Sequence, residues 1–186
     1  MDWGTLVATV SGGFIAMSGT VLADQLRHRH EEDRSGTARR RAVYIEFISA
    51  AGLCHARLRQ LAQGSDAVPD LDAATRAALT DAAIYEVRER FFIDATTEVA
   101  GAGQAMFERL RALRRTVATG ASEGSPAFHA AYHPYIGAVW DFRVAVRREL
   151  EGRHLVPAVF GWGAWDGSDR CPLCRAEPDG AGAGDG

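Results

Sequence analysis

The sequence feature that most constrains the fold is an uncharged stretch near the start of the chain. Residues 3–23 contain no Asp, Glu, Lys or Arg, and Asp2 and Asp24 bracket them. A helix of this length spans roughly 30 Å, because each residue adds about 1.5 Å, and this matches the hydrocarbon core of a bilayer. The stretch therefore predicts a membrane-spanning helix, and we assign residues 1–24 to a membrane anchor.

Arginine residues follow the predicted anchor at once, and none precedes it. The six between residues 24 and 41 are Arg27, Arg29, Arg34, Arg39, Arg40 and Arg41. Positively charged flanks stay on the cytoplasmic side of a membrane. We therefore expect a single-pass protein of the cell membrane, with its N-terminus outside and its bulk cytoplasmic. Residues 25–37 form a charged segment next to the membrane.

Two other interpretations of the uncharged stretch stay open. Val21-Leu22-Ala23 resembles the cleavage site of a signal peptide, although the stretch lacks a basic n-region. A buried helix of a soluble protein would also be free of charge, although the length of the stretch counts against it.

One face of the predicted anchor carries small residues at every fourth position. These residues are Gly4, Ala8, Gly12, Ala16 and Thr20. Small residues at this spacing let two helix backbones approach closely in lipid. We therefore expect a homodimer through Gly4, Ala8, Gly12 and Ala16, unless the pattern only reflects a composition rich in Gly and Ala.

Helical periodicity dominates residues 38–151. Apolar side chains recur there at intervals of three and four residues, which is typical of amphipathic helices. The side chains that we expect in the core are Phe47, Leu58, Val87, Phe91, Leu110 and Phe142. The short loops at 63–70 and 119–125 favour antiparallel neighbours. We predict an all-α fold, in which a single transmembrane helix precedes an antiparallel bundle of three or four helices.

Two details of the predicted bundle depend on helix-breaking residues. Residues 70–118 should form one long bent helix or two consecutive helices. Phe91-Phe92-Ile93-Asp94 interrupts the apolar pattern there, Asp94 can cap a new helix after a kink, and Gly101 and Gly103 soften the same region. Pro134 should kink the last helix or restart it near His133, because proline cannot donate a helical hydrogen bond.

Residues 152–186 are rich in Gly and aromatic residues and lack helical periodicity, so we predict a flexible, irregular tail. This tail contains Cys171-Pro-Leu-Cys174, and two thiolates at that spacing can bind one zinc ion. A closed zinc site needs four ligands, and His154 is the nearest further candidate. Alternatively, two chains could each donate a cysteine pair. A redox dithiol is another interpretation, although the βαβ setting of thioredoxin-type sites is absent.

The sequence shows no catalytic motif, neither a Gly-x-Ser-x-Gly elbow nor a phosphate loop ending in Gly-Lys. The net charge of −3 gives no overall attraction to nucleic acid. Arg109, Arg111, Arg114 and Arg115 suit the negative end of a helix dipole, with a phosphate or lipid site as the alternative. Cys54 and His55 suit helix packing.

We therefore predict a membrane-tethered scaffold or interaction module that is not an enzyme and that binds a protein partner of unknown identity. Apart from zinc at Cys171 and Cys174, we expect no cofactor. The alternative is a metal- or redox-sensing module that acts through the same cysteine pair.

Three stretches of the predicted bundle carry a resemblance to known proteins. They are Arg41-Ala-Val-Tyr44-Ile-Glu-Phe47, Val87-x3-Phe91-x2-Asp94-x4-Val99, and Ala131-Tyr132 followed by Phe142-x4-Arg147-x-Glu149-Leu150. In these stretches the chain resembles uncharacterised short proteins of high-GC Gram-positive bacteria, which have one N-terminal membrane span and a small cytoplasmic helical bundle. The resemblance covers most of residues 38–150 and implies that fold, but it implies no activity. The cysteine pair lies outside it.

Overall fold

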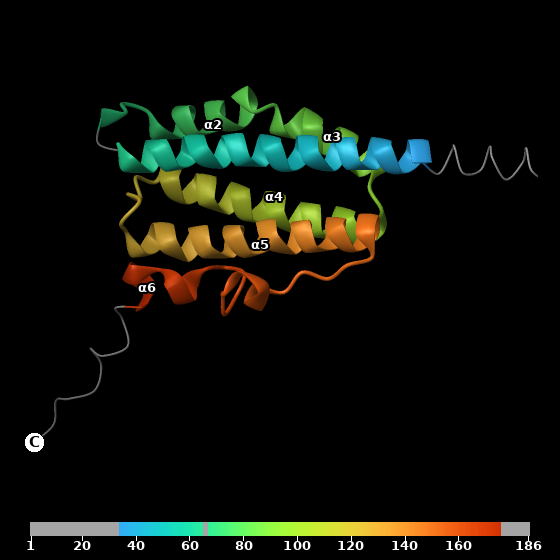
Figure 1. The fold of residues 1–186 in the computed structure, drawn as a ribbon. Helices are drawn as coiled ribbons and strands as arrows, with labels where there is room; N and C mark the ends of the chain where they lie inside the picture. Colours follow the sequence, from blue (N-terminus) through green and yellow to red (C-terminus); the bar gives the residue numbers. More distant parts are fainter. Residues whose placement is uncertain (1–33, 65–66, 176–186) are drawn as a thin grey trace, which may run out of the picture. The chain divides into compact units, whose positions relative to one another are not determined.

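The part of the protein that the structure describes is helical. The computed structural model describes residues 34–64 and 67–175, and these residues contain no β-strand (Figure 1). The chain divides into two compact units, residues 1–39 and residues 40–186. In the first unit the described residues, 34–39, are helical. The fold and the sites described below belong to the second unit, and its helices confirm the all-α prediction.

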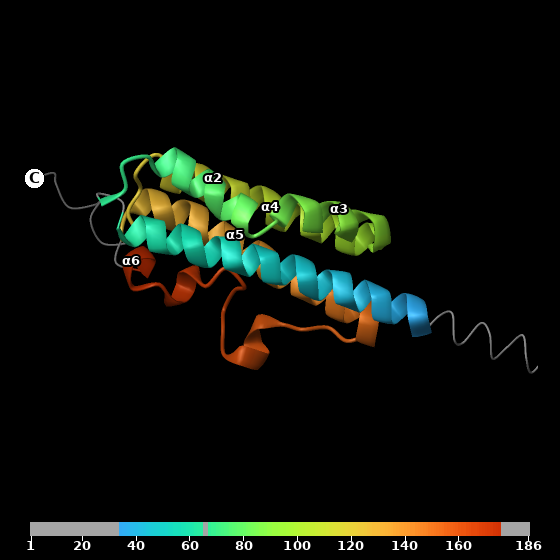
Figure 2. The ribbon, with the colours of Figure 1, turned by 90° about the horizontal axis from the view of Figure 1, so that it is seen from above.

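The second unit is an antiparallel helical bundle. A long helix is described over residues 34–63, and its part from residue 40 onward belongs to this unit. The longer helices that follow within the described residues are α2 (Leu71–Asp81), α3 (Ile84–Asp94), α4 (Thr97–Ala118) and α5 (Pro126–Glu151). Figures 1 and 2 show residues 40–63 of the long first helix, the α2–α3 pair, α4 and α5 lying side by side, with alternating chain direction.

Residues 70–118 differ from the prediction of one bent helix or two consecutive helices. They form α2, α3 and α4. Ala83 adopts a left-handed conformation with φ 49° between α2 and α3, and Ala95 and Thr96 are extended between α3 and α4. The chain reverses at the second break, so α4 runs antiparallel to the α2–α3 pair (Figure 1). The second break follows Asp94, where the interruption was expected, although the new helix begins at Thr97 and is not capped by Asp94. The first break, at Ala82 and Ala83, was not predicted, because no Gly or Pro marks it.

The core is built around aromatic rings from three helices. Phe47 of the long first helix stacks on Phe91 of α3, with ring centroids 4.4 Å apart. Phe142 of α5 packs edge-on against both rings, each at 5.7 Å. Gly103 of α4 faces the same cluster, because a Cβ atom at Gly103 would lie 2.5 Å from the Phe91 ring. All six side chains predicted for the core are at most 5% exposed, which confirms that prediction.

Helix α5 continues through Pro134 from Pro126 to Glu151. The expected restart near His133 does not occur. Although Pro134 cannot donate to the preceding turn, the helix on either side is held by burial of His133, Tyr135 and Ala138. The uninterrupted helix keeps the two turns on either side of Pro134 in one register.

No helix in the described ranges is long and apolar enough to cross a membrane. The predicted anchor, residues 3–23, and its face of Gly4, Ala8, Gly12 and Ala16 lie outside the described residues. The anchor, its orientation and the homodimer therefore stay predictions.

Candidate metal centre

Helix α5 supplies two histidines to one face. Its first turn is capped by the Ser125 side chain, which accepts a hydrogen bond from the Phe128 N–H at 3.2 Å, and Pro126 occupies the first turn. Both features favour the start of a helix at this point. His129 and His133 follow at a spacing of four residues. This spacing places their side chains one above the other on the same face of a helix.

The segment after α5 lies along that helix instead of forming the flexible tail that its composition suggests. Its described part, residues 152–175, contains the short helices η2 (Pro157–Phe160), η3 (Ser168–Arg170) and α6 (Pro172–Arg175). Gly152, with φ 64°, ends α5 in the left-handed conformation that glycine adopts without strain. The chain then turns back beneath α5, as Figure 1 shows in orange and red. Residues 176–186 lie outside the described residues.

A cluster of tryptophans attaches this segment to α5. Trp140 of α5 stacks on Trp165, with ring centroids 4.6 Å apart and an angle of 8° between the planes. Trp162 and Phe160 pack against the same indole at 5.0 Å and 5.3 Å. Aromatic pairs at such distances contribute about 0.5–1.5 kcal/mol each beyond the area that they bury. The cluster therefore brings residues 166–175, the last described residues, next to the first half of α5.

A tight turn after Trp165 places the cysteine pair next to the two histidines. The Asp166 carboxylate accepts hydrogen bonds from the N–H and the hydroxyl of Ser168, at 3.1 Å and 3.0 Å. Gly167 between them has φ 69°, which favours glycine. The short helix α6 begins directly after Cys171, and the Arg175 N–H donates to the Cys171 carbonyl at 3.1 Å. Cys171 and Cys174 therefore lie on the same turn.

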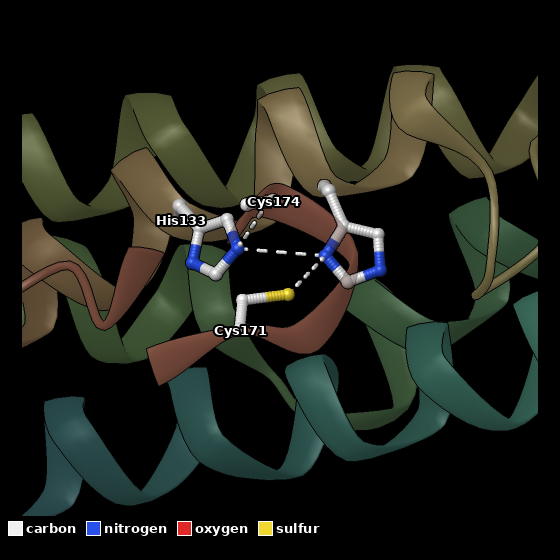
Figure 3. Close-up of side chains that lie close together, drawn as sticks. His133, Cys171 and Cys174 are labelled. Carbon is white, nitrogen blue, oxygen red and sulfur yellow. Dashed lines mark hydrogen bonds between the residues drawn. The ribbon is translucent and has the colours of Figure 1, made fainter. Parts of the chain in front are cut away.

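The side chains of His129, His133, Cys171 and Cys174 converge within one chain. One potential ligand atom from each lies within 4.8 Å of the other three. The Cys171 sulfur is 3.4 Å from Nδ1 of His129, and the Cys174 sulfur is 3.2 Å from Nε2 of His133. The two imidazole nitrogens are 3.4 Å apart. Figure 3 shows the His133 ring above the Cys171 side chain, with a dashed line from the ring to Cys174.

Three of the six separations between these ligand atoms are close to those around a tetrahedral zinc ion, and the other three are at most 4.8 Å. With Zn–N bonds of about 2.0–2.1 Å and Zn–S bonds of about 2.3 Å, a tetrahedron places two nitrogens about 3.3 Å apart and a nitrogen and a sulfur about 3.5 Å apart. The N···N distance of 3.4 Å and the N···S distances of 3.4 Å and 3.2 Å lie close to these values. The four residues are therefore close enough to hold a metal ion with little rearrangement.

A backbone contact fixes the orientation of one histidine. Nδ1 of His133 is 2.9 Å from the backbone carbonyl oxygen of Asp166. A carbonyl accepts only, so Nδ1 carries the proton and Nε2 keeps its lone pair for a ligand. Hydrogen bonds of this kind to the second ring nitrogen are a regular feature of metal-binding histidines. The turn that positions Cys171 and Cys174 thus also selects the tautomer of His133 suited to metal binding.

The thiols of the chain differ in their environments. A hydrogen bond to the Cys171 sulfur from the backbone of Cys174 is the largest cause that lowers the pKa of Cys171, to about 7. Cys171 is half-buried and Cys174 is exposed. Burial raises the pKa of Cys54 to about 12, because an apolar core disfavours a thiolate. The thiolate form, which binds metals, is thus favoured at the candidate centre and disfavoured in the core.

The structure unites the predicted cysteines with partners that sequence reasoning missed. Cys171 and Cys174 lie together as expected, but their neighbours are His129 and His133. His154, the further ligand suggested by proximity in sequence, is exposed and is not in the group. The spacing His-x3-His within a predicted helix was the signal that could have identified the second pair.

No family model, no curated protein and no solved structure matches this chain. What the candidate centre does must therefore be argued from its own residues.

Proposed function

We propose that the chain binds one zinc ion through His129, His133, Cys171 and Cys174, and that the ion fastens the C-terminal segment to the bundle of a non-catalytic interaction module. The observation that carries the proposal is the convergence of these side chains, within 4.8 Å, from two segments separated by about forty residues. A full set of ligands within one chain removes the need for a second chain to donate a cysteine pair.

The chemistry of the donor atoms supports zinc. Thiolate and imidazole ligands suit zinc, whereas calcium and magnesium prefer oxygen ligands. Tetrahedral sites with two cysteines and two histidines are a common structural form for zinc. The Cys-x2-Cys and His-x3-His spacings of this chain both fall within the usual range for such sites.

The number of ligands supports a structural ion. A catalytic zinc keeps one coordination position open for water or substrate, and a closed structural site fills all four with protein ligands. Here two nitrogens and two sulfurs would occupy all four positions around the ion. We therefore assign no reaction to the ion.

The ion would attach residues 152–175 to α5, because this segment buries little apolar surface. None of the residues in η2, η3 or α6 is buried. Leu173, between the two cysteines, is 52% exposed, and Phe160 is 44% exposed. Apart from the tryptophan cluster, little apolar area fastens this segment to α5, so ligand bonds at Cys171 and Cys174 would contribute much of its attachment.

Metal analysis of the full-length protein, purified in detergent, tests the proposal. We expect one zinc ion per chain, and we expect His129→Asn and Cys171→Ser to lose it. His154→Asn and Cys54→Ala are matched controls, because they remove the same types of side chain away from the centre and should retain zinc. Chelation should alter tryptophan fluorescence, since Trp162 and Trp165 belong to the released segment, and should leave the helical circular dichroism in place.

Three outcomes would contradict this proposal. The first is protein without zinc that also fails to take up added zinc. The second is zinc retained when His129 is replaced. The third is one zinc per two chains, which would return the site to a pair of cysteines from each of two protomers.

The second part of the proposal is that residues 3–23 tether this module to the membrane. It is supported by the length of the uncharged stretch and by the arginines that follow it. Fractionation of cells should recover the chain with membranes, and protease added outside intact cells should leave the bundle uncut. A soluble mature chain that begins at Asp24 would instead identify a signal peptide.

A sensing role is the second candidate, and the accessibility of the thiols favours it. Cys174 is exposed, and the pKa of Cys171 is lowered to about 7, first by the backbone hydrogen bond from Cys174. Hydrogen peroxide could oxidise the two thiols to a disulfide, with two electrons passing to the peroxide and water as the product. Zinc release and disulfide formation at micromolar peroxide would support sensing, whereas release only under harsh oxidation would leave the structural role alone.

A further inference from the structure

A pocket rich in arginine lies where α2, α3 and α4 meet, away from the residues of the metal centre. Its volume is about 260 Å³. The arginines that line it are Arg76 of α2 and Arg111, Arg114 and Arg115 of α4. Thr80 and Leu79 of α2 and Tyr85 of α3 complete the lining. Four cationic side chains from two different helices therefore converge on one hollow.

The nearby carboxylates balance only part of this charge. Asp72 pairs with both Arg76 and Arg114, and its contact with Arg114 is 3.0 Å. Glu108 lies 3.7 Å from Arg111, at the long end of the ion-pair range. Within the described residues no carboxylate is recorded in ion-pair contact with Arg115. Four guanidinium groups thus face two carboxylates, which leaves an excess of two positive charges around the pocket.

Aromatic packing holds part of the pocket in place. Tyr85 packs edge-on against Phe107, with ring centroids 5.7 Å apart, and the Arg111 guanidinium lies 5.9 Å from the same ring. The Thr80 hydroxyl donates to the Arg76 carbonyl at 3.3 Å, so it is already engaged. Tyr85 lines the pocket and is 45% exposed.

The helix dipole does not account for this arrangement. Cations are favoured within the last turn of a helix, and the effect falls off beyond it. Arg115 lies in the last turn of α4, but Arg111 lies seven residues before its end at Ala118. Arg76 lies in the middle of α2. The convergence of Arg76 and Arg111 with Arg115 therefore needs another explanation.

We propose that this pocket binds a phosphate-bearing anion, with Arg76, Arg111, Arg114 and Arg115 as its cationic contacts. A phosphate monoester carries close to two negative charges at neutral pH, which matches the excess charge. The planar guanidinium group donates two parallel hydrogen bonds to phosphate oxygens, and this geometry makes arginine well suited to phosphate recognition. The phosphate group can come from a soluble metabolite or from a lipid headgroup.

Calorimetric titration of the full-length protein in detergent tests the proposal with three probes. Inorganic pyrophosphate tests recognition of phosphate itself. Glycerol 3-phosphate and dihexanoyl phosphatidic acid carry the same phosphate monoester without and with acyl chains. Similar affinity for the last two identifies a soluble phosphate as the ligand, whereas tighter binding of the short-chain lipid identifies a lipid headgroup.

Paired variants separate the pocket from general charge. Arg111→Gln with Arg115→Gln should weaken pyrophosphate binding by about a hundredfold, because each lost hydrogen bond to a charged group accounts for roughly a tenfold change. Arg109→Gln with Arg153→Gln removes the same charge from two exposed positions outside the pocket. This control should change affinity less than about threefold, because physiological salt screens the attraction between distant charges and the ligand. Tyr85→Phe should weaken binding while keeping the packing on Phe107.

The result that would overturn the proposal is absence of pyrophosphate binding, or equal losses in the pocket variant and the control variant. Both replaced pocket arginines are exposed, so the helical fold should survive, and circular dichroism checks this directly. If the double variant fails to fold, Arg115→Lys serves instead. It keeps the charge but loses the paired hydrogen bonds, and unchanged affinity would then contradict the proposed contact.

Discussion

Two glycines of α4, Gly101 and Gly103, provide a sharp test of the packing described above. A Cβ atom at Gly103 would lie 2.5 Å from two carbons of the Phe91 ring and 3.2 Å from the Phe47 ring. The Phe91 ring cannot retreat easily, because it is fully buried and stacked on Phe47 at 4.4 Å. At Gly101, which is exposed, a Cβ atom would meet no atom within 4 Å.

Gly101→Ala should therefore raise the free energy of unfolding, whereas Gly103→Ala should leave it unchanged or lower it. Alanine is favoured over glycine inside a helix by about 1 kcal/mol, so Gly101→Ala should stabilise the protein by up to that amount. Gly103→Ala gains the same helical preference, but overpacking of a filled core costs about 1–3 kcal/mol. The free energies of unfolding of the two variants should thus differ by about 1–3 kcal/mol, with Gly103→Ala the less stable.

Urea unfolding followed by circular dichroism measures this difference, and Gly101→Ala serves as the control for helix propensity. A second substitution, Phe91→Leu, should reduce the penalty of Gly103→Ala, because it removes the ring atoms that the new methyl group meets. If Gly103→Ala stabilises the protein as much as Gly101→Ala does, α4 does not approach α3 as closely as the structure describes.

Phe91, His55 and Cys54 lie within the bundle, and each gives a measurable expectation. Phe91→Ala should lower the free energy of unfolding by about 3–5 kcal/mol, measured in urea, because it leaves a cavity in a fully packed core. Burial, and secondarily Arg59, lowers the pKa of His55 from 6.5 to about 4. At pH values between 4 and 6.5, His55 is therefore protonated in the unfolded chain but neutral in the folded chain, so acid destabilises the fold. As the pH drops from about 7 to 4.5, the free energy of unfolding should fall by roughly 2–3 kcal/mol more in the wild type than in His55→Phe. Iodoacetamide at pH 8 should modify Cys171 and Cys174 in the zinc-free native protein. It should spare Cys54, because burial raises the pKa of that thiol to about 12. When the reagent is applied to the unfolded protein, mass spectrometry should find all three thiols modified.

The core of the bundle could be predicted from the sequence because its signal is local. Phe47, Leu58 and Phe142 lie on apolar faces with helical period, and such faces are buried wherever the helices pack. The helix boundaries within residues 70–118 could not be predicted in the same way. Gly103 looked like a weak point, yet it lies inside α4 as the residue that gives the Phe91 ring room. The chain reverses at Ala95 and Thr96, directly after the interruption that the sequence shows at Phe91–Asp94, but the pattern did not show that the kink is a full reversal.

Half of the candidate metal centre could be predicted from the sequence, and the reason lies in sequence separation. Cys171 and Cys174 form a motif within one turn, so inspection of the sequence finds them. Their partners, His129 and His133, are about forty residues away, and each pair by itself is compatible with many roles. The two pairs meet because the chain runs back along α5 after Gly152, and the contacts of Trp140 hold it there. The aromatic residues of that segment were visible, but their packing partner was not.

The large separation between the two halves of the metal centre has a consequence for how the protein unfolds. His129 and Cys171 are 42 positions apart in the chain. An ion bound to both would close a loop that contains most of α5 and the segment beneath it. In the chain-entropy model, a cross-link around a loop of this length disfavours the unfolded chain by about 4 kcal/mol. While the ion stays bound, the C-terminal part of α5 could fray only as far as His133, and the unfolded chain would keep the closed loop.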